Sequence, residues 1–178
     1  MKPVCPINRR TALKLGIAAM GSLFLPGLGV VARGQGVSIS DIEWPSLSTG
    51  DAGGDVYLVQ YLLRARGYDI VVDGNYAAQT ARRVRQFQAA SGLPVTGEVG
   101  GSTWRALIIP VQYGSRGDAV RAAQFKLKHL GFQTIVDGRF SDGTRRTVRR
   151  FQVNQGITAD GVCGRQTWEY LIKAQPND

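Results

Sequence analysis

A repeat with a period of 64 residues constrains the fold of this chain more than any other feature. Residues 50–108 align with residues 114–172 without a gap, and 22 of the 59 aligned pairs are identical. Seven of the shared positions are glycines, the residue that tight turns favour. Agreement over this length indicates an internal duplication, so the fold must be built from two similar small units.

Each copy is predicted to form three helices. In copy two, Val120, Ala123 and Leu127 share one helical face, and Gly131 ends that helix. The equivalent stretch of copy one, VYLVQYLL, could form a strand by itself, but its alignment with copy two favours a helix. A second helix follows an Asp-Gly turn, and a third, short helix ends each copy. The predicted fold is therefore mostly α, with two tandem three-helix domains.

Four segments are predicted along the chain. Residues 1–34 form an export signal and residues 35–46 form a spacer. Copy one spans residues 47–109 and copy two spans residues 111–174, so only a few residues join them. Such a short linker does not allow the two copies to tumble independently.

The N-terminus resembles a twin-arginine (Tat) export signal. Arg9 and Arg10 precede the apolar run LGIAAMGSLFLPGLGVVA, which ends in small residues typical of a cleavage site. Ala12 stands where the Tat pattern usually has Phe. An uncleaved membrane anchor is the alternative, although a run of 18 residues is at the lower limit for a span. We expect export to the periplasm, cell wall or extracellular space, with only transient membrane contact.

The formal net charge of +9 is unevenly distributed. Residues 35–111 contain 6 basic and 7 acidic residues, whereas the chain from residue 112 onward contains 11 basic and 6 acidic residues. Four basic residues lie on the second helix of copy two: Arg145, Arg146, Arg149 and Arg150. They indicate either a solvated helix face or a surface for carboxylates and phosphates. Because an exported protein rarely meets chromosomal DNA, nucleic acid is not expected as a partner.

Both copies contain the same ordered motif string. It reads G-x-x-V-x-x-x-Q-x-x-L-x-x-x-G, then D-G-x-[FY], then T-x-x-x-V-x-x-F-Q, and it ends in T-W-x-x-L. On these motifs the chain resembles the peptidoglycan-binding domain 1 family over residues 47–174. The resemblance implies a non-catalytic three-helix module that holds exported proteins on the bacterial cell wall, often beside a hydrolase domain. Peptidoglycan or an associated wall polymer is the partner that it implies.

Several positions depart from the family pattern. Ala77 and Ser141 stand where glycine is usual after D-G-x-[FY], and Thr96 replaces the aspartate found at Asp160. The second helix of copy one has Arg83 where a small apolar residue is common. Copy one is thus the more altered of the two.

Many motif residues have structural interpretations that need no ligand. An aspartate before a glycine favours a turn, because its carboxylate can accept hydrogen bonds from nearby backbone amides. Thr144 and Thr167 are placed where a hydroxyl can cap the start of a helix. The remaining structural candidates are Trp104 and Trp168 as core residues and Gln88 and Gln152 as buried amides that bond to loop backbone.

The loops that carry these turns are also the candidate ligand-binding groove. Asp73, Asp137 and Asp160 would supply carboxylates to this groove. The aromatic rings of Tyr76 and Phe140 would pack on the C–H groups of sugars. The four arginines named above complete the set of candidate binding residues.

No catalytic constellation is visible in the sequence. The single histidine, His129, is too little for a zinc site, and Cys163 aligns with Val99, as expected for a small buried hydrophobe. Glu98 and Glu169 do not stand in matching motifs, as a pair of glycosidase carboxylates would. We therefore expect a protein that is not an enzyme and that has no cofactor and no metal site.

A docking function is the alternative to wall binding. Tyr57 and Leu62 are apolar where copy two has Arg121 and Lys126. Such extra apolar surface must be covered by something. A secreted cell-wall hydrolase would cover it if the protein were a targeting subunit, but packing of the two copies against each other is the simpler hypothesis.

Overall fold

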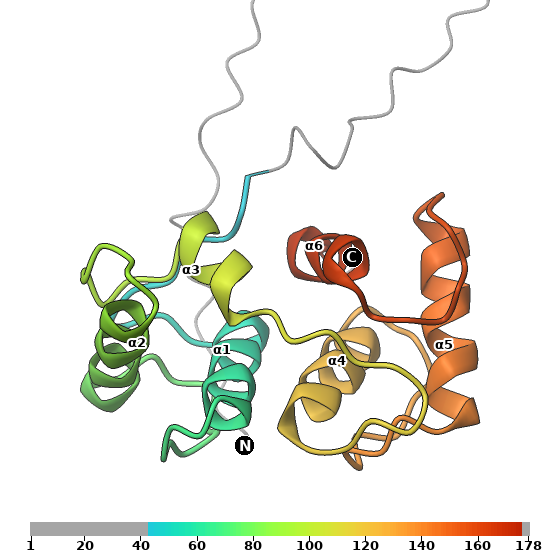
Figure 1. Cartoon of the computed structure of the whole chain (residues 1–178), viewed down its shortest axis with the longest axis horizontal. Coiled ribbons are helices and arrows are strands. Elements are labelled where there is room, and N and C mark those ends of the chain that lie inside the picture. The colour runs from blue at the N-terminus through green and yellow to red at the C-terminus, as the bar shows by residue number, and fades with distance from the viewer. Residues whose placement is uncertain (1–42, 176–178) are drawn as a thin grey trace, which may run out of the picture. The chain divides into compact units, whose positions relative to one another are not determined.

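The computed structural model of the protein describes residues 43–175, and the predicted export signal lies outside this range. Within the described range the protein is all-helical, and helices α1–α3 belong to copy one and α4–α6 to copy two, as predicted (Figure 1). No helix in this range is long and apolar enough to cross a membrane. The helices are α1 (Gly54–Ala65), α2 (Ala78–Ala90), α3 (Gly101–Leu107), α4 (Asp118–His129), α5 (Asp142–Asn154) and α6 (Arg165–Lys173).

A tryptophan lies at the centre of each small core, as predicted. Trp104 and Trp168 are fully buried, and each donates its indole N–H to a loop carbonyl 59 residues earlier in the chain. The acceptors are Pro45 for Trp104, at 2.7 Å, and Ile109 for Trp168, at 2.8 Å. Because Pro45 and Ile109 are themselves 64 residues apart, the structural repeat begins before residue 47. The fold of copy one therefore extends into the segment that was predicted as spacer.

The two copies pack against each other through α1 and α4. The start of α1 faces the end of α4, so the two helices run antiparallel: Asp55 pairs with Lys126, and Gly54 lies against His129. A Cβ added at Gly54 would come within 2.9 Å of the His129 imidazole, so the absence of a side chain allows this close approach. The ring centroids of Tyr57 and Phe125 are 5.0 Å apart across the same interface.

The interface covers the apolar face that distinguishes copy one. Leu62 is fully buried and Tyr57 is half-buried, with Phe125 of α4 against its ring. The simpler of the two hypotheses for this face, packing between the copies, is thus confirmed.

A buried lysine is paired across this interface. Lys126 is 1% exposed, and its ammonium lies 2.7 Å from Oδ1 of Asp55, whose side chain is 21% exposed. A buried charge without a partner is strongly unfavourable, so this pair makes the packing of α1 on α4 sensitive to either residue.

We expect Asp55→Ala to lower the free energy of unfolding by about 3 kcal/mol, because it leaves the Lys126 ammonium buried and unpaired. Lys126→Met keeps a similar volume without the charge and should cost less than about 1.5 kcal/mol. Urea denaturation followed by circular dichroism measures both. Equal losses in the two variants would contradict the assignment of the cost to the stranded charge.

Candidate functional site

A buried glutamine side chain holds the first Asp-Gly turn of copy two. Gln124 on α4 donates from Nε2 to Oδ1 of Asp137 at 2.9 Å and to the Arg139 carbonyl at 3.0 Å. Its Oε1 accepts the backbone N–H of Gly138 at 2.8 Å, and the Thr144 hydroxyl lies 3.1 Å from Nε2. The amide of one helix thereby fixes the loop that leads into the next helix.

Copy one repeats the arrangement around Gln60. Its Nε2 donates to Asp73 at 2.8 Å and to the Asn75 carbonyl at 3.0 Å, while Oε1 accepts the N–H of Gly74 at 2.8 Å. The sequence alone assigned this bonding role to neither Gln60 nor Gln124. The signal that could have revealed this role is that glutamine stands at the same buried helix position in both copies.

A second glutamine in each copy holds the loop before the last helix, as predicted for Gln88 and Gln152. Gln152 donates to Asp160 at 2.7 Å and to the Val162 carbonyl at 3.0 Å, and it accepts the N–H of Gly161 at 2.8 Å. In copy one the hydroxyl of Thr96 takes the place of the Asp160 carboxylate, 3.3 Å from Nε2 of Gln88. The departure from the family pattern at Thr96 therefore preserves the turn.

The predicted helix caps are wrong. The first residues of α5 and α6 are preceded by Ser141 and Gly164, and neither residue makes a side-chain cap bond. The hydroxyls of Thr144 and Thr167 instead donate to loop carbonyls at 3.3 Å and 3.0 Å and face the glutamine amides. They belong to the turn network, because the preceding loop folds back over the helix start.

The Asp-Gly turns keep their carboxylates ionised. The backbone N–H of Arg139 and the amide of Gln124 lower the pKa of Asp137 below its usual value, and Asn75 and Gln60 do the same for the pKa of Asp73. Gly138 has a φ of +76°, and a Cβ there would meet the Arg121 guanidinium at 2.9 Å. The turn thus requires glycine and holds a negative charge at neutral pH.

The two aromatic residues predicted to line a groove are buried instead. Tyr76 is 1% exposed and donates its hydroxyl proton to the Gly97 carbonyl at 2.7 Å, and burial raises its pKa. Phe140, its counterpart, is 2% exposed. Neither ring has a free face for a sugar, so the prediction that these rings line a ligand groove is corrected: they are core residues that anchor the turn.

The arginines of α5 are not equivalent to one another. Arg145 pairs with Asp142 at 2.8 Å and stacks over the Tyr113 ring at 5.4 Å, and its Nε is buried without a hydrogen-bond partner among the described residues. The Arg145 side chain therefore takes part in packing as well as presenting a charge. Of these four arginines, the exposed ones are Arg146, Arg149 and Arg150.

A hollow of about 360 Å³ opens in copy two between the loop that precedes the Asp-Gly turn and the start of α5. Of the nine predicted binding residues, only Asp137 lines it. Sequence reasoning did not find this hollow, although the departure at Arg83, whose counterpart is Thr147, marks its position. The lining residues are Gln133, Thr134, Ile135, Asp137, Ser141, Gly143, Thr144 and Thr147.

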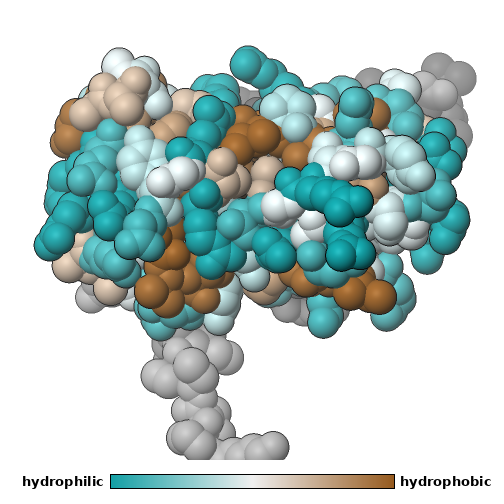
Figure 2. All heavy atoms as spheres, turned by 60° about the horizontal axis from the view of Figure 1, so that its bottom comes forward, coloured by the Kyte–Doolittle hydropathy of each residue, from teal (hydrophilic) through white to brown (hydrophobic). Residues whose placement is uncertain are grey.

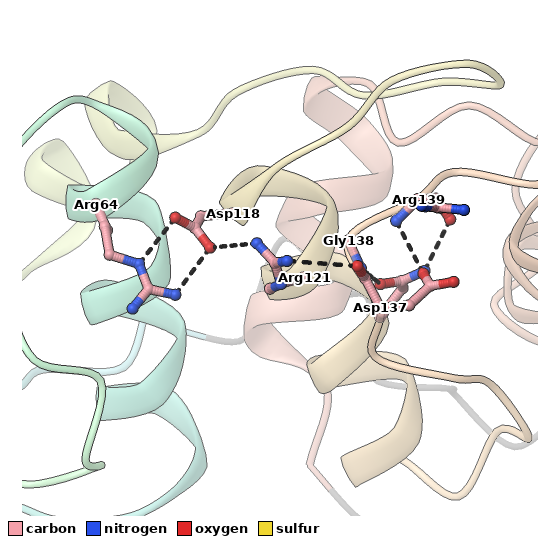
Figure 3. Close-up of polar contacts among 7 residues, drawn as sticks. Arg64, Asp118, Arg121, Asp137, Gly138 and Arg139 are labelled. Carbon is pink, nitrogen blue, oxygen red and sulfur yellow. Dashed lines mark hydrogen bonds and ion pairs between the residues drawn. The ribbon is translucent and has the colours of Figure 1, made fainter.

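A chain of charged groups connects the copy interface to this turn (Figure 3). Arg64 of α1 makes two bonds of 2.8 Å to the Asp118 carboxylate, which also pairs with Arg121 at 3.0 Å. The bonds from Arg64 lower the pKa of Asp118. Arg121 in turn reaches the Asp137 carbonyl at 3.5 Å. Contacts that begin at Arg64 of copy one thus extend, through Asp118 and Arg121, to the turn that borders the hollow of copy two.

The residues considered for catalysis have other surroundings. Cys163 is fully buried, as predicted, and burial raises its thiol pKa. His129 is exposed, as expected of a surface residue, and stacks on Phe125 with ring centroids 6.2 Å apart. Across residues 43–175, no three His, Cys, Asp or Glu side chains gather closely enough to hold a metal ion.

The sequence matches the family model for the peptidoglycan binding domain twice, at residues 52–107 and 116–171. The chain belongs to this family. The two matched segments contain all four glutamine-bonded turns, so the buried amide network lies within the residues that define the family.

Two curated relatives are named as cell-wall enzymes. The chain is 34% identical over 150 residues to the N-acetylmuramoyl-L-alanine amidase CwlM of Mycobacterium tuberculosis, a match that covers 71% of this chain and 37% of the amidase. It is 37% identical over 68 residues to the zinc D-Ala-D-Ala carboxypeptidase of Streptomyces albus G, covering 36% of this chain and 27% of that enzyme. The chain therefore spans well under half the length of either relative.

Solved structures show similarity over shorter segments. A peptidoglycan-binding protein from Clostridioides difficile is 35% identical with a TM-score of 0.36, over 36% of this chain and 41% of that one. The SleB N-terminal domain is 37% identical with a TM-score of 0.36, over 37% of this chain and 92% of that one.

We expect Gln152→Ala to lower the free energy of unfolding by at least about 2 kcal/mol. The change leaves the Gly161 N–H and the Val162 carbonyl without their buried partner, at about 1–3 kcal/mol for each unsatisfied group. Gln79→Ala, at an exposed position of α2, is the control and should stay within about 0.5 kcal/mol of the parent. Urea denaturation compares the two, and similar stabilities would show that the amide network is dispensable.

Proposed function

We propose that this is an exported, non-catalytic protein that attaches to bacterial peptidoglycan through its two tandem domains. The observation that carries the proposal is the pair of family matches, which together take up most of residues 43–175. The peptidoglycan-binding frame is thus present twice, and only a short linker lies between the copies.

The two named relatives support this division of roles. Both carry enzyme names, yet the chain matches 37% of the amidase and 27% of the carboxypeptidase. We infer that the shared part is their wall-binding portion and that catalysis belongs to the rest of those proteins. The buried thiol of Cys163 is consistent with a structural role here.

Export is proposed from the twin arginines of residues 1–34, which lie outside the described residues. A binding protein of the cell wall must reach the wall, and Arg9 and Arg10 ahead of an apolar run supply a route.

We expect Arg9→Lys combined with Arg10→Lys to abolish export, since the Tat route reads the arginine pair. Immunoblots of cytoplasmic and exported fractions measure the distribution of the protein. Arg33→Lys, outside the pair, is the control and should be exported as the parent is. Normal export of the double variant would remove the Tat assignment.

The exposed arginines of α5 offer long-range attraction to wall anions. Arg146, Arg149 and Arg150 lie on one exposed helix of the copy that carries the excess positive charge. Guanidinium groups suit carboxylates and phosphates, and exposed charges are screened within about 8 Å at physiological ionic strength. Binding to the wall should therefore weaken as salt rises.

We expect Arg146→Gln, Arg149→Gln and Arg150→Gln together to weaken binding to purified wall sacculi about tenfold at low salt, since three exposed contacts of about 0.2–1 kcal/mol each are lost. Arg82→Gln in copy one, aligned with Arg146, should change affinity less than about twofold by the same reasoning. Co-sedimentation at low and high salt measures both, with folding checked by circular dichroism.

The supernatants of this assay also test the absence of catalysis. Peptides or reducing sugars released above the level of a buffer control would overturn the non-catalytic proposal. If the folded triple variant binds as the parent does, these arginines form only a solvated helix face and take no part in binding.

A targeting subunit of a secreted hydrolase is the second candidate function. The face first considered for such docking, around Tyr57 and Leu62, is occupied by α4. The face shown in Figure 2 is largely hydrophilic, with separate apolar patches rather than one continuous apolar surface. Because α4 covers the face considered for docking, we propose wall binding as the function and docking as the alternative.

A further inference from the structure

One wall residue of the copy-two hollow is replaced by an arginine in copy one. Thr147 and Gln133 line the hollow, and their copy-one counterparts are Arg83 and Asp69. The Arg83 side chain reaches from α2 to the loop and donates its Nε–H to the Asp69 carbonyl at 2.8 Å. Its Nη1 also donates to Oε1 of Gln86 at 3.0 Å, so Arg83 bonds with a charged side chain the loop carbonyl that Thr147 bonds with its hydroxyl in copy two.

The same loop carbonyl is recognised differently in the two copies. In copy two the Thr147 hydroxyl lies 3.0 Å from the Gln133 carbonyl and 3.1 Å from the Gly143 carbonyl. A short hydroxyl thus reaches both the helix and the loop. The copy-one arrangement shows that the equivalent loop carbonyl, in this fold, accepts a cationic N–H donor.

The charge of the hollow agrees with a cationic occupant. Asp137 is the one ionisable side chain among the residues that line it, and its carboxylate is ionised at neutral pH. The hydrogen bonds from the Gln124 amide and from the backbone N–H of Arg139 both end on Oδ1 of the Asp137 carboxylate. The other lining groups are hydroxyls, amides, one glycine and Ile135, which is 77% exposed.

A second, cationic hollow adjoins the first. It has a volume of about 220 Å³, shares Ser141 with the first hollow, and is lined by the exposed residues Arg116 and Arg139. The backbones of these two arginines pair in an isolated antiparallel bridge. Their counterparts in copy one are Ala52 and Asn75, which are uncharged. Copy two therefore places a negative hollow beside a positive one, and copy one lacks the two arginines of the positive hollow.

We propose that copy two binds a zwitterionic end of a wall peptide, with the amine in the hollow beside Asp137 and the carboxylate over Arg116 and Arg139. Copy one lacks this combination, because Arg83 replaces Thr147 and uncharged residues replace the two arginines. The tandem thus carries one peptide site. This inference rests on the proposed function, since it names the part of peptidoglycan that the protein recognises.

The test is a titration of the ¹⁵N-labelled full chain with a synthetic wall-type tripeptide that ends in a diamino acid with a free side-chain amine and a free carboxylate. The amide signals of Gln133 and Gly143 should shift, and those of their counterparts Asp69 and Gln79 should not. Acetylating the amine, or converting the carboxylate to an amide, should each weaken binding at least about tenfold, because a charged contact is lost. Equal shifts in both copies, or equal binding of the blocked peptides, would overturn the proposal.

Substitutions at Thr147 provide the matched pair. Thr147→Arg reproduces the copy-one residue and should abolish the peptide-induced shifts, while Thr147→Ser keeps the hydroxyl and should bind as the parent does. The dispersion of the amide signals shows whether each variant is folded. Peptide binding by folded Thr147→Arg at parental affinity would overturn the proposal; if that variant does not fold, the blocked peptides on the parent protein decide.

Co-sedimentation with wall sacculi separates this inference from the function beneath it. A parent protein that fails to sediment with sacculi contradicts the proposed function itself. A parent protein that sediments, but shows no shift with the tripeptide, retains wall binding and loses the peptide site. Loss of both sedimentation and peptide shifts in folded Thr147→Arg, with both retained in Thr147→Ser, would support the two proposals together.

Discussion

Four buried glutamine amides hold the loops of this protein in place. The described residues form helices and isolated bridges, so the loops between helices cannot satisfy their backbone groups in a sheet. A glutamine side chain carries both a donor and an acceptor, and Gln124 uses them to bond Gly138 and Asp137 at once. Because a domain of this size has a small core, the positions of the four turns that these glutamines bond depend on these hydrogen bonds.

This dependence explains what could be predicted from the sequence. The helices follow from apolar spacing and from the agreement of two copies, and the Asp-Gly turns follow from local chemistry alone. The burial of Tyr76 and Phe140 does not follow from the sequence. Each residue comes after a turn, and the ring points inward only because the loop folds over the next helix. Thr144 was misassigned for the same reason, since its partner is an amide on another helix.

The hollow was beyond prediction for a related reason. Its walls come from a loop and a helix whose separation is set by Gln124, which bonds to both through Asp137 and Thr144. The sequence showed only that Arg83 departs from the family pattern. Only the fold brings Arg83 to the carbonyl of Asp69, whose counterpart Gln133 lines the hollow.

The interface between the copies uses equivalent helices but not equivalent charges. Asp55 pairs with Lys126, and the counterparts of these residues are Ala119 and Leu62. The duplicated faces could have packed as an identical pair, and instead the ionic contact is formed by residues that differ between the copies. Complementary charges of this kind favour contact between unlike copies over contact between like ones.

The two copies have consequently taken different roles around one shared frame. Copy one keeps its glutamine-bonded turns, and its Arg64 joins Asp118 and Arg121 in the chain that reaches the Asp137 turn of copy two. On the binding proposed here, two identical weak sites do not raise the affinity for the wall by avidity, because the sites are unlike. The proposed contributions to affinity are instead one peptide site in copy two and the exposed charges of α5. On that proposal both copies keep the family pattern, but the peptide site belongs to copy two alone.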